Sequence, residues 1–222
     1  MRSKMRVGVT MRIVDAIDYH DPRDALSHEW IRFIETLGHS PILIPSVLED
    51  PVAFFQSIEC EGLILTNGEN VKLESSAEGW TGSERDITEA RLLTFCLERK
   101  IPVIGVCRGL QFINIFYGGS QRPAEQPHVN VEHTINIIDP EFREALQIEE
   151  AVTNSYHQIV VAPDDIATTL IPFAISDGVI EGLYSKSDRV LAVQWHPERQ
   201  NRSPNIDRIL FNNILSTDAR SF

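Results

Sequence analysis

The chain has 222 residues and a mass of 25.1 kDa, and we expect one globular domain that spans residues 1–222. Its 42% hydrophobic and 23% charged residues exclude a disordered, collagen-like or coiled-coil protein. The formal net charge of −12 excludes a global attraction to nucleic acid or to an anionic membrane. A local basic pocket stays compatible with this composition.

No apolar run reaches the roughly 18 residues that a membrane helix needs, and the segment before Thr10 lacks a signal-peptide core. We therefore expect a cytoplasmic protein. Its cysteines, Cys60, Cys96 and Cys107, are odd in number and widely spaced, which fits neither a disulfide framework nor a CxxC metal site. A cysteine with a function here should act as a thiol.

The first half of the chain alternates short β-branched runs with helical patterns. Strands are predicted over 5–9, 41–44, 62–65 and 101–106, and helices over 24–37, 50–57, 83–99 and 110–117. Ser83 is expected to cap the third helix, with Asp86 at the spacing of a capping box. Strict alternation of strand and helix predicts an open, mostly parallel α/β sheet with helices on both faces.

The second half is richer in strand signals. Short β-branched runs bounded by Pro, Asp or Gly predict strands over 133–138, 159–161, 171–175, 179–184 and 190–195. A closing helix is predicted over 204–215. We expect these strands to extend one edge of the sheet in antiparallel pairing.

The segment Gly105-Val106-Cys107-Arg108-Gly109 joins a predicted strand to a predicted helix. This G-x-C-x-G pattern is typical of a nucleophile elbow, in which a sharp turn exposes the central side chain at the carboxyl edge of the sheet. The helix N-terminus and Arg108 both favour the Cys107 thiolate, and free backbone N–H groups there can hold an oxyanion. A buried cysteine before a glycine-containing turn explains the pattern equally well when it stands alone.

A partner for Cys107 occurs at the end of a later strand, in Val193-Gln194-Trp195-His196-Pro197-Glu198. Glu198 lies two residues after His196, from where its carboxylate can hold the imidazole in one tautomer. A cysteine, a histidine and a glutamate of this kind supply a nucleophile, a general base and an orienting group. The combination of Cys107 with His196 and Glu198 favours a catalytic histidine over a histidine that only forms the polar end of a strand.

The residues GVCRGLQ and QWHPE, at this separation, resemble the class I glutamine amidotransferase fold, a flavodoxin-like architecture. The resemblance implies that Cys107 is the nucleophile, His196 the base and Glu198 the orienting residue. It also identifies the segment 65–70 as an oxyanion loop, in which the Gly68 N–H joins the Arg108 N–H. Asn67 departs from the glycine usual in that loop, but Asn tolerates the left-handed conformation better than most residues.

Two further segments resemble the γ-glutamyl hydrolase branch, the peptidase C26 relatives of γ-glutamyl-γ-aminobutyrate hydrolase. They are Arg85-Asp86 with Glu89 and Leu92, and Asn154-Ser155-Tyr156-His157-Gln158. The resemblance implies substrate-binding roles for Gln111, Asn70, Ser155 and Tyr156. His157 is expected to be a satisfied loop histidine, because His196 already fills the position of the base.

The other histidines, among them His128 and His133, lack metal-ligand spacing, and no phosphate-binding glycine motif is present. We expect no metal and no cofactor. Oligomeric state cannot be predicted from the sequence, and a homodimer stays open.

By resemblance, the chain is a γ-glutamyl amide hydrolase that forms a glutamyl thioester. Its compact length and the short connection 118–128 favour γ-glutamyl-CDP-amidate, from bacterial capsule phosphoramidate synthesis, over γ-glutamyl-γ-aminobutyrate as the substrate. A pyrophosphate in such a substrate could be bound by basic residues, for which the candidates are Arg108, Arg122, Arg199 and Arg202, although each taken singly is more simply a surface residue.

Two alternatives stay open beside the hydrolase. In the first, the chain is the glutaminase subunit of an amidotransferase that delivers ammonia to a separate synthetase. In the second, it is a catalytically silent binding module. An inert Cys107 would favour the silent module.

Overall fold

The computed structural model describes residues 4–77 and 79–216, with the side chains of residues 126–128 outside that description. Its strands are β1 (Arg6–Thr10), β2 (Arg12–Val14), β3 (Arg23–Ala25), β4 (Ser40–Ile44), β5 (Gly62–Leu65), β6 (Glu74–Ser76), β7 (Gly79–Thr81), β8 (Val103–Val106), β9 (Arg122–Ile137), β10 (Glu150–Val160), β11 (Ile171–Ser176), β12 (Val179–Ser185) and β13 (Val190–Val193). Its helices are α1 (His28–Thr36), α2 (Pro51–Ser57), α3 (Glu84–Arg99), α4 (Arg108–Phe116), α5 (Pro140–Leu146) and α6 (Pro204–Ile214).

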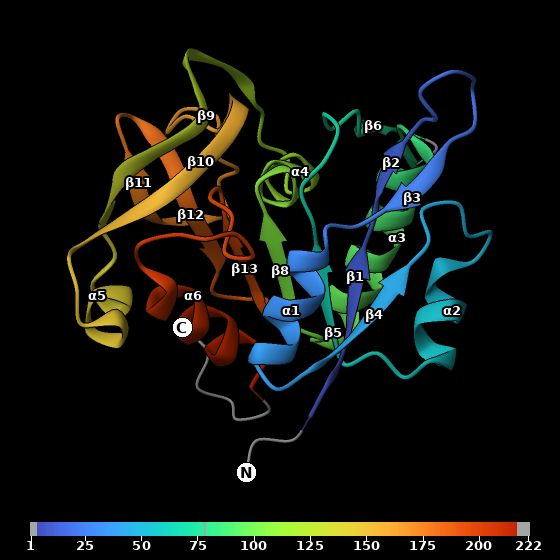
Figure 1. Cartoon of the computed structure of the whole chain (residues 1–222), viewed down its shortest axis with the longest axis horizontal. Coiled ribbons are helices and arrows are strands. Elements are labelled where there is room, and N and C mark those ends of the chain that lie inside the picture. Colours follow the sequence, from blue (N-terminus) through green and yellow to red (C-terminus); the bar gives the residue numbers. More distant parts are fainter. Residues whose placement is uncertain (1–3, 78, 217–222) are drawn as a thin grey trace.

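Across the described ranges, one nine-stranded sheet organises the fold in the order β10-β9-β11-β12-β13-β8-β5-β1-β4 (Figure 1). The strands β13, β8, β5, β1 and β4 are parallel neighbours. Three of them, β5, β8 and β13, are buried along their whole length. Such continuous apolar strands require cover on both faces, which confirms the predicted α/β sheet.

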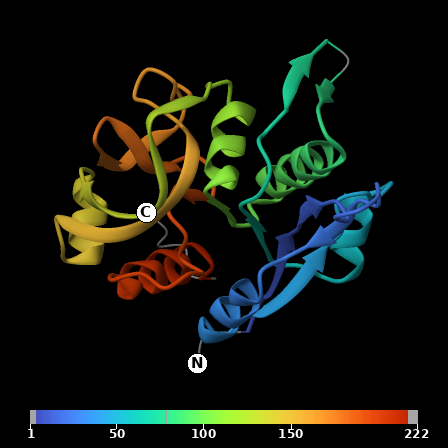
Figure 2. The same cartoon turned by 45° about the horizontal axis from the view of Figure 1, so that its top comes forward.

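Helices cover both faces of the sheet. Apolar residues of α1, α5 and α6 pack in one core, including Trp30, Phe142 and Phe211. Apolar residues of α2, α3 and α4 pack in the other, including Phe55 and Leu93. Figure 2 shows α1 and α6, in blue and red, on the opposite side of the sheet from the green helices α3 and α4.

The strands of the second half pair antiparallel, as predicted, and β12 joins them to the parallel part through β13. The prediction was wrong about the length of two of them. β9 begins at residue 122 rather than 133, and β10 begins at residue 150 rather than 159. Each supplies the other's backbone hydrogen bonds, so polar residues that favour turns in isolation stay extended. The expected short connection 118–128 is therefore mostly strand.

In the first half most boundaries differ by one or two residues, the hairpins β2–β3 and β6–β7 were not predicted, and the largest difference concerns the first helix. The predicted helix over 24–37 begins only at His28, capped by Ser27, because Asp24 and Ala25 belong to the β2–β3 hairpin. The α3 prediction is confirmed together with its capping box of Ser83 and Asp86. None of the helices in the described part of the chain combines the length and apolar character needed to span a bilayer.

Candidate active site

The candidate site lies where neighbouring parallel strands end. In the sheet, Gly105 of β8 is in register with Leu65 of β5, and Val106 of β8 is in register with Val193 of β13. The residues after these ends therefore emerge side by side at the carboxyl edge of the sheet, where open α/β folds bind their ligands. The segments brought together are Thr66–Gly68, Cys107–Arg108 and Gln194–Glu198.

Cys107 has φ 54° and ψ −102° and stands directly before α4, with its backbone N–H donated to the Val193 carbonyl. A non-glycine residue at such a φ is strained, as expected of a nucleophile elbow. Both flanking glycines are required by close packing. A Cβ on Gly105 would lie 2.6 Å from the Gly109 carbonyl oxygen, and a Cβ on Gly109 would overlap the Leu65 carbonyl oxygen.

His196 and Glu198 form a buried pair. The Nδ1 atom of His196 lies 2.8 Å from a carboxylate oxygen of Glu198, and both side chains are almost inaccessible to solvent. The Nε2 atom of His196 has no hydrogen-bond partner among the described atoms. Burial lowers the pKa of His196, but the Glu198 carboxylate and the Cys107 sulfur outweigh it and raise the pKa to about 9. Glu198 thus fixes Nδ1 and leaves Nε2 to act on the Cys107 side.

Asn154 holds the loop that carries His196. Its side-chain oxygen accepts the His196 N–H at 2.9 Å, and its amide nitrogen donates to the carbonyls of His196 at 2.9 Å and Gln200 at 3.2 Å. Asn154 was expected only as part of a family segment, without a role. Asn154 lies on β10, which three strands separate from β13 in the sheet, so local sequence could not have indicated this contact.

Gln194 is a second residue whose role sequence reasoning missed. It is fully buried, and its Nε2 lies 3.8 Å from the Cys107 sulfur, within the range of a hydrogen bond to sulfur. Its Oε1 is buried without a hydrogen-bond partner in the described structure. A donor at this place can hold the Cys107 sulfur in one position.

The segment after β5 forms the predicted loop beside Cys107. Gly68 has φ +155°, and a Cβ there would lie 2.8 Å from the Arg12 Cβ. Arg85 supports the loop by donating to the carbonyls of Thr66 at 2.7 Å and Asn67 at 3.3 Å. The Trp30 indole N–H donates to the Asn67 side chain at 3.1 Å, so Asn67 is anchored although it replaces the usual glycine.

The guanidinium of Arg108 is buried beneath the elbow, where it pairs with Asp86 and Glu89. Glu89 also pairs with Arg85 at 2.8 Å and accepts the Thr10 hydroxyl at 2.7 Å. Burial raises the pKa of Glu89, but the two arginines outweigh it and hold that pKa below its usual range. The suggestion that the Arg108 side chain meets a substrate pyrophosphate is therefore wrong. Its backbone N–H remains at the helix start.

Of the four expected substrate-binding residues, three lie on one side of the site and the fourth lies in the loop after β5. Gln111 is buried and donates its side-chain amide to the Ile159 carbonyl at 2.9 Å, and Ser155 is buried in β10. The Tyr156 ring meets His196 edge-on with 5.4 Å between ring centroids. Asn70 is exposed at the end of the loop that contains Gly68. Gln111, Ser155 and Tyr156 thus lie on the side of the site formed by α4 and β10.

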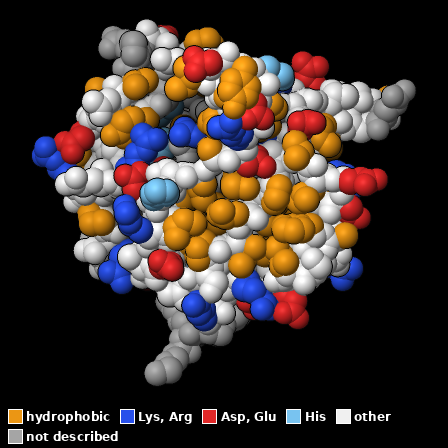
Figure 3. Space-filling model, turned by 45° about the vertical axis from the view of Figure 1, so that its right-hand side comes forward, with side chains coloured by type: hydrophobic (Ala, Val, Ile, Leu, Met, Phe, Trp, Pro, Cys, Tyr) orange, Lys and Arg blue, Asp and Glu red, His pale blue; other side chains and the backbone are white. Residues whose placement is uncertain are grey.

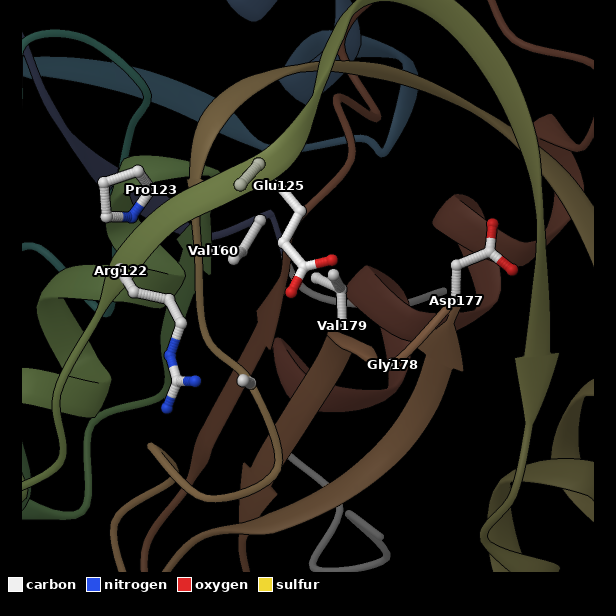
Figure 4. Close-up of a pocket in the computed structure, with 9 residues that line it drawn as sticks. Arg122, Pro123, Glu125, Val160, Asp177, Gly178 and Val179 are labelled. Carbon is white, nitrogen blue, oxygen red and sulfur yellow. The ribbon is translucent and has the colours of Figure 1, made fainter.

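The remaining arginine candidates do not share one pocket. Arg122 pairs with Asp165 and lines a cavity of about 470 Å³. In that cavity the Glu125 side chain of β9 points towards Val179, and Arg122 lies to one side (Figure 4). Neither Cys107 nor His196 lines that cavity. Arg202 pairs with Glu132 at the surface. Of the four arginines, only Arg199 keeps an accessible guanidinium next to the catalytic histidine candidate.

His157 lies in β10 and not in a loop, which corrects the expectation. Its Nε2 is 3.6 Å from the buried carboxylate of Glu181, and the Nε2 of His133 is 3.4 Å from the same group. The backbone carbonyl of Glu181 accepts the Gln194 N–H at 2.8 Å, which connects this cluster to the site. The His128 side chain lies outside the described residues. Among the described residues, no group of His, Cys, Asp and Glu side chains is suited to a metal ion.

Comparison with known proteins identifies several similar chains. The sequence profile of the family described as Peptidase C26 matches residues 7–198. A γ-glutamyl-CDP-amidate hydrolase of Campylobacter jejuni is 26% identical over 91% of this chain and 94% of its own length. A γ-glutamyl-γ-aminobutyrate hydrolase of Escherichia coli O157:H7 is 28% identical over 86% of this chain and 85% of its own length.

Among solved structures, a glutamine amidotransferase of Thermotoga maritima superposes with a TM-score of 0.59. The alignment covers 94% of this chain and 82% of that one at 16% identity. At this identity the likeness concerns the fold alone, and it agrees with the mostly parallel sheet and flanking helices described above.

Proposed function

The chain belongs to the Peptidase C26 family, and from that premise we propose that it is a cysteine-dependent hydrolase of small γ-glutamyl amides. The observation that carries the proposal is the position of Cys107 and His196 at the ends of two neighbouring strands. Cys107 occupies a strained elbow at the end of β8, and the neighbouring strand β13 leads to a His196 whose Nδ1 is held by Glu198 at 2.8 Å. A nucleophile, a base and an orienting carboxylate at adjacent strand ends suit acyl transfer.

In the first half of the reaction, the Cys107 thiolate attacks the γ-carbonyl carbon and a carbon–sulfur bond forms. The carbonyl electron pair moves to oxygen, and the N–H groups of Gly68 and Arg108 hold that oxyanion. When the oxyanion collapses, the carbon–nitrogen bond breaks and His196 gives its Nε2 proton to the leaving nitrogen. The pKa of about 9 keeps His196 protonated at neutral pH, as this step needs.

In the second half, His196 takes a proton from water, and the hydroxide attacks the glutamyl thioester. Collapse of the second oxyanion breaks the carbon–sulfur bond and returns the Cys107 thiolate. The net change is one water consumed, with glutamate and a free amine or amidate released. No cofactor enters this sequence, and Gln111, Asn70 and the backbone of Ser155 and Tyr156 bind the glutamyl part.

The leading substrate is γ-glutamyl-CDP-amidate, an intermediate of capsule phosphoramidate synthesis, and the next is γ-glutamyl-γ-aminobutyrate. The relatives that carry these names span most of this chain, at 26% and 28% identity. Since residues 122–128 belong to a strand, the short connection once expected there no longer supports the first choice. We further propose that residues 1–222 act as one domain in the cytoplasm.

The test is release of glutamate by the isolated protein from glutamine, γ-glutamyl-γ-aminobutyrate and γ-glutamyl-CDP-amidate. We expect turnover of at least one conjugate to exceed that of glutamine, and Cys107→Ala to abolish it. Cys96→Ala is the matched control, because Cys96 is a buried thiol near the C-terminal end of α3 and belongs to a different apolar core from Cys107.

Silence of the wild-type protein on every conjugate would contradict a stand-alone hydrolase. Low activity on glutamine that rises when a synthetase is added would instead favour the amidotransferase subunit. Unchanged activity in Cys107→Ala would refute the covalent mechanism whichever substrate is used.

A further inference from the structure

A small cavity lies next to the proposed oxyanion loop and is bordered by two arginines. Arg12 and Arg199 line it together with Ser27, Thr66 and Asn67. Its volume is about 20 Å³. A water molecule needs roughly 10–15 Å³ on the same measure, so the cavity has room for one oxygen-sized group rather than for a whole ligand.

Arg12 begins β2 and packs directly on the loop. Its Cβ lies 2.8 Å from the position that a Cβ on Gly68 would take. The side chain is exposed, and within the described part of the chain it forms neither an ion pair nor a side-chain hydrogen bond. Its charge is therefore available to a ligand beside the proposed oxyanion donor.

Arg199 approaches from the other side, in the loop that follows β13. Its guanidinium carbon lies 4.1 Å above the Tyr156 ring, and that ring meets His196 edge-on. Its Nε is 3.6 Å from Glu198, and its backbone N–H donates to the His196 carbonyl at 3.2 Å. The stacking on Tyr156 fixes the direction of the guanidinium next to His196.

The position of this arginine pair relates it to the leaving group. The leaving nitrogen must come within reach of His196 Nε2, because that atom supplies its proton in the proposed mechanism. Arg199 flanks the His196 loop and Arg12 flanks the Gly68 loop, whereas Gln111, Ser155 and Ile159 lie along α4 and β10. A group attached to the leaving nitrogen can therefore reach the arginines, while Gln111 and the backbone of Ser155 and Tyr156 are left to the glutamyl part.

The charges around the cavity favour an anion. Glu198 is bound to His196 Nδ1 at 2.8 Å, and Glu69 pairs with Arg85 at 3.0 Å. Glu29 accepts the Ser27 hydroxyl at 2.7 Å, and Asp24, which precedes the lining residue Ala25, accepts the Ser46 N–H at 3.1 Å. On the face drawn in Figure 3, Lys and Arg side chains likewise border a hollow, although the chain carries a net charge of −12.

We propose that Arg12 and Arg199 form an anion subsite that selects γ-glutamyl conjugates whose leaving group carries a carboxylate or a phosphate. The inference rests on the proposed hydrolase function and names its substrate class. Glutamine, which releases neutral ammonia, leaves the subsite unused. Two arginines can bind a carboxylate or a phosphate through the same charge-assisted hydrogen bonds. Experiment therefore decides which of the two anions the leaving group carries.

The experiment compares matched substrates that differ only in the anion. γ-Glutamyl-γ-aminobutyrate is paired with γ-glutamyl-butylamide, and γ-glutamyl-O-phosphoethanolamine with γ-glutamyl-ethanolamine. We expect kcat/KM to favour the anionic member of at least one pair, and Arg12→Gln or Arg199→Gln to reduce that preference about 10- to 100-fold. Arg32→Gln removes the same charge from the exposed face of α1 and should leave the preference intact.

The pair that responds identifies the anion as carboxylate or phosphate. An equal loss on the anionic and neutral members would mean that the arginines bind the glutamyl part, which would overturn the proposal. An unchanged preference in both variants would overturn it as well. Failure of the hydrolase function is distinguishable, because the wild-type protein would then release glutamate from none of these substrates.

Discussion

Two buried charge clusters flank the candidate site, and they are built from different chemistry. Beneath the elbow and the oxyanion loop, the carboxylates of Asp86 and Glu89 are held by Arg85 and Arg108. On the β9–β12 side, the carboxylate of Glu181 lies between two histidines, His133 and His157. Guanidinium groups stay charged at any ordinary pH, whereas the charge of the second cluster depends on the protonation of His133.

The difference indicates which part of the site is held by charges that do not change with pH. The arginine cluster joins α3, α4 and the loop after β5, so it fixes Cys107 and the Gly68 loop relative to each other. The histidine cluster joins β9, β10 and β12 and reaches the site only through the Glu181 carbonyl and Gln194. We therefore expect the arginine cluster to be essential for folding and the histidine cluster to make stability depend on pH.

The largest effect is expected for Glu89→Gln. The substitution keeps the side-chain shape but leaves Arg85 and Arg108 buried with too little compensating charge. Breaking a buried ion pair from one side costs about 3–5 kcal/mol, a large part of the stability of a domain. Urea unfolding of the variant should show this loss, or the variant should fail to accumulate as folded protein.

The matched control is Glu69→Gln. Glu69 contacts the same Arg85 at 3.0 Å, but its side chain is 31% exposed. An ion pair that water can replace contributes about 0–1 kcal/mol. Equal losses in the two variants would show that burial does not distinguish these pairs and would contradict the comparison.

A smaller loss is expected for Glu181→Gln. Removal of this carboxylate takes away the anion beside His133 and His157, but His133 can release its proton and become neutral. The loss should therefore be about 1–3 kcal/mol near pH 6, the range for one unsatisfied buried group, and should decrease as the pH rises. A loss as large as that of Glu89→Gln, independent of pH, would show that the two clusters do not differ in this way.

The wild-type protein should show the same cluster in its pH dependence. Burial lowers the pKa of His133, but Glu181 outweighs it and holds the pKa above 6.5, so this contribution is complete below about pH 6.5. It is lost as the pH rises through the raised pKa. Burial raises the pKa of Glu181, but the histidines outweigh it and lower the pKa below 4.5. Its contribution is lost as the pH falls through that lowered value.

The cluster therefore contributes fully between about pH 4.5 and 6.5. The free energy of unfolding measured from pH 5 to 8 should fall as the pH rises through the raised pKa of His133, and Glu181→Gln should flatten the curve. An equally steep curve in the variant would assign the pH dependence to other groups.

Sequence reasoning identified the parts of the site that local patterns encode. The G-x-C-x-G elbow at Cys107 requires glycines beside a turn, and the capping box of Ser83 and Asp86 requires only a fixed spacing along one helix. The roles of Cys107, His196 and Glu198 in catalysis stay predictions. Cys107, His196 and Glu198 lie close together because they follow two neighbouring parallel strands, β8 and β13. Alternating strand and helix patterns in the sequence predict such a parallel sheet.

The rest depends on contacts between segments far apart in the chain. Asn154 lies on β10, which three strands separate from β13 in the sheet, and yet its side chain holds the His196 loop. Gln194 reaches Cys107 because β8 and β13 are in register. Arg108 was misread because sequence shows its charge but not the carboxylates of α3 that bury it. Such partners become visible only when the sheet order is known.

The smallest effect is expected for Ser83→Ala, and it tests what orients Asp86 in the arginine cluster. The Ser83 hydroxyl accepts the Asp86 N–H at 3.2 Å and donates to its carboxylate at 2.7 Å. The same carboxylate also accepts the N–H groups of Ser83 at 3.0 Å and Lys72 at 3.2 Å, besides pairing with Arg108. Because these partners survive the substitution, the loss should be that of a helix cap, about 1 kcal/mol by urea unfolding, with activity retained. A loss near that of Glu89→Gln, with activity abolished, would instead show that the cap itself holds Asp86 against Arg108, and that the arginine cluster depends on a surface hydroxyl.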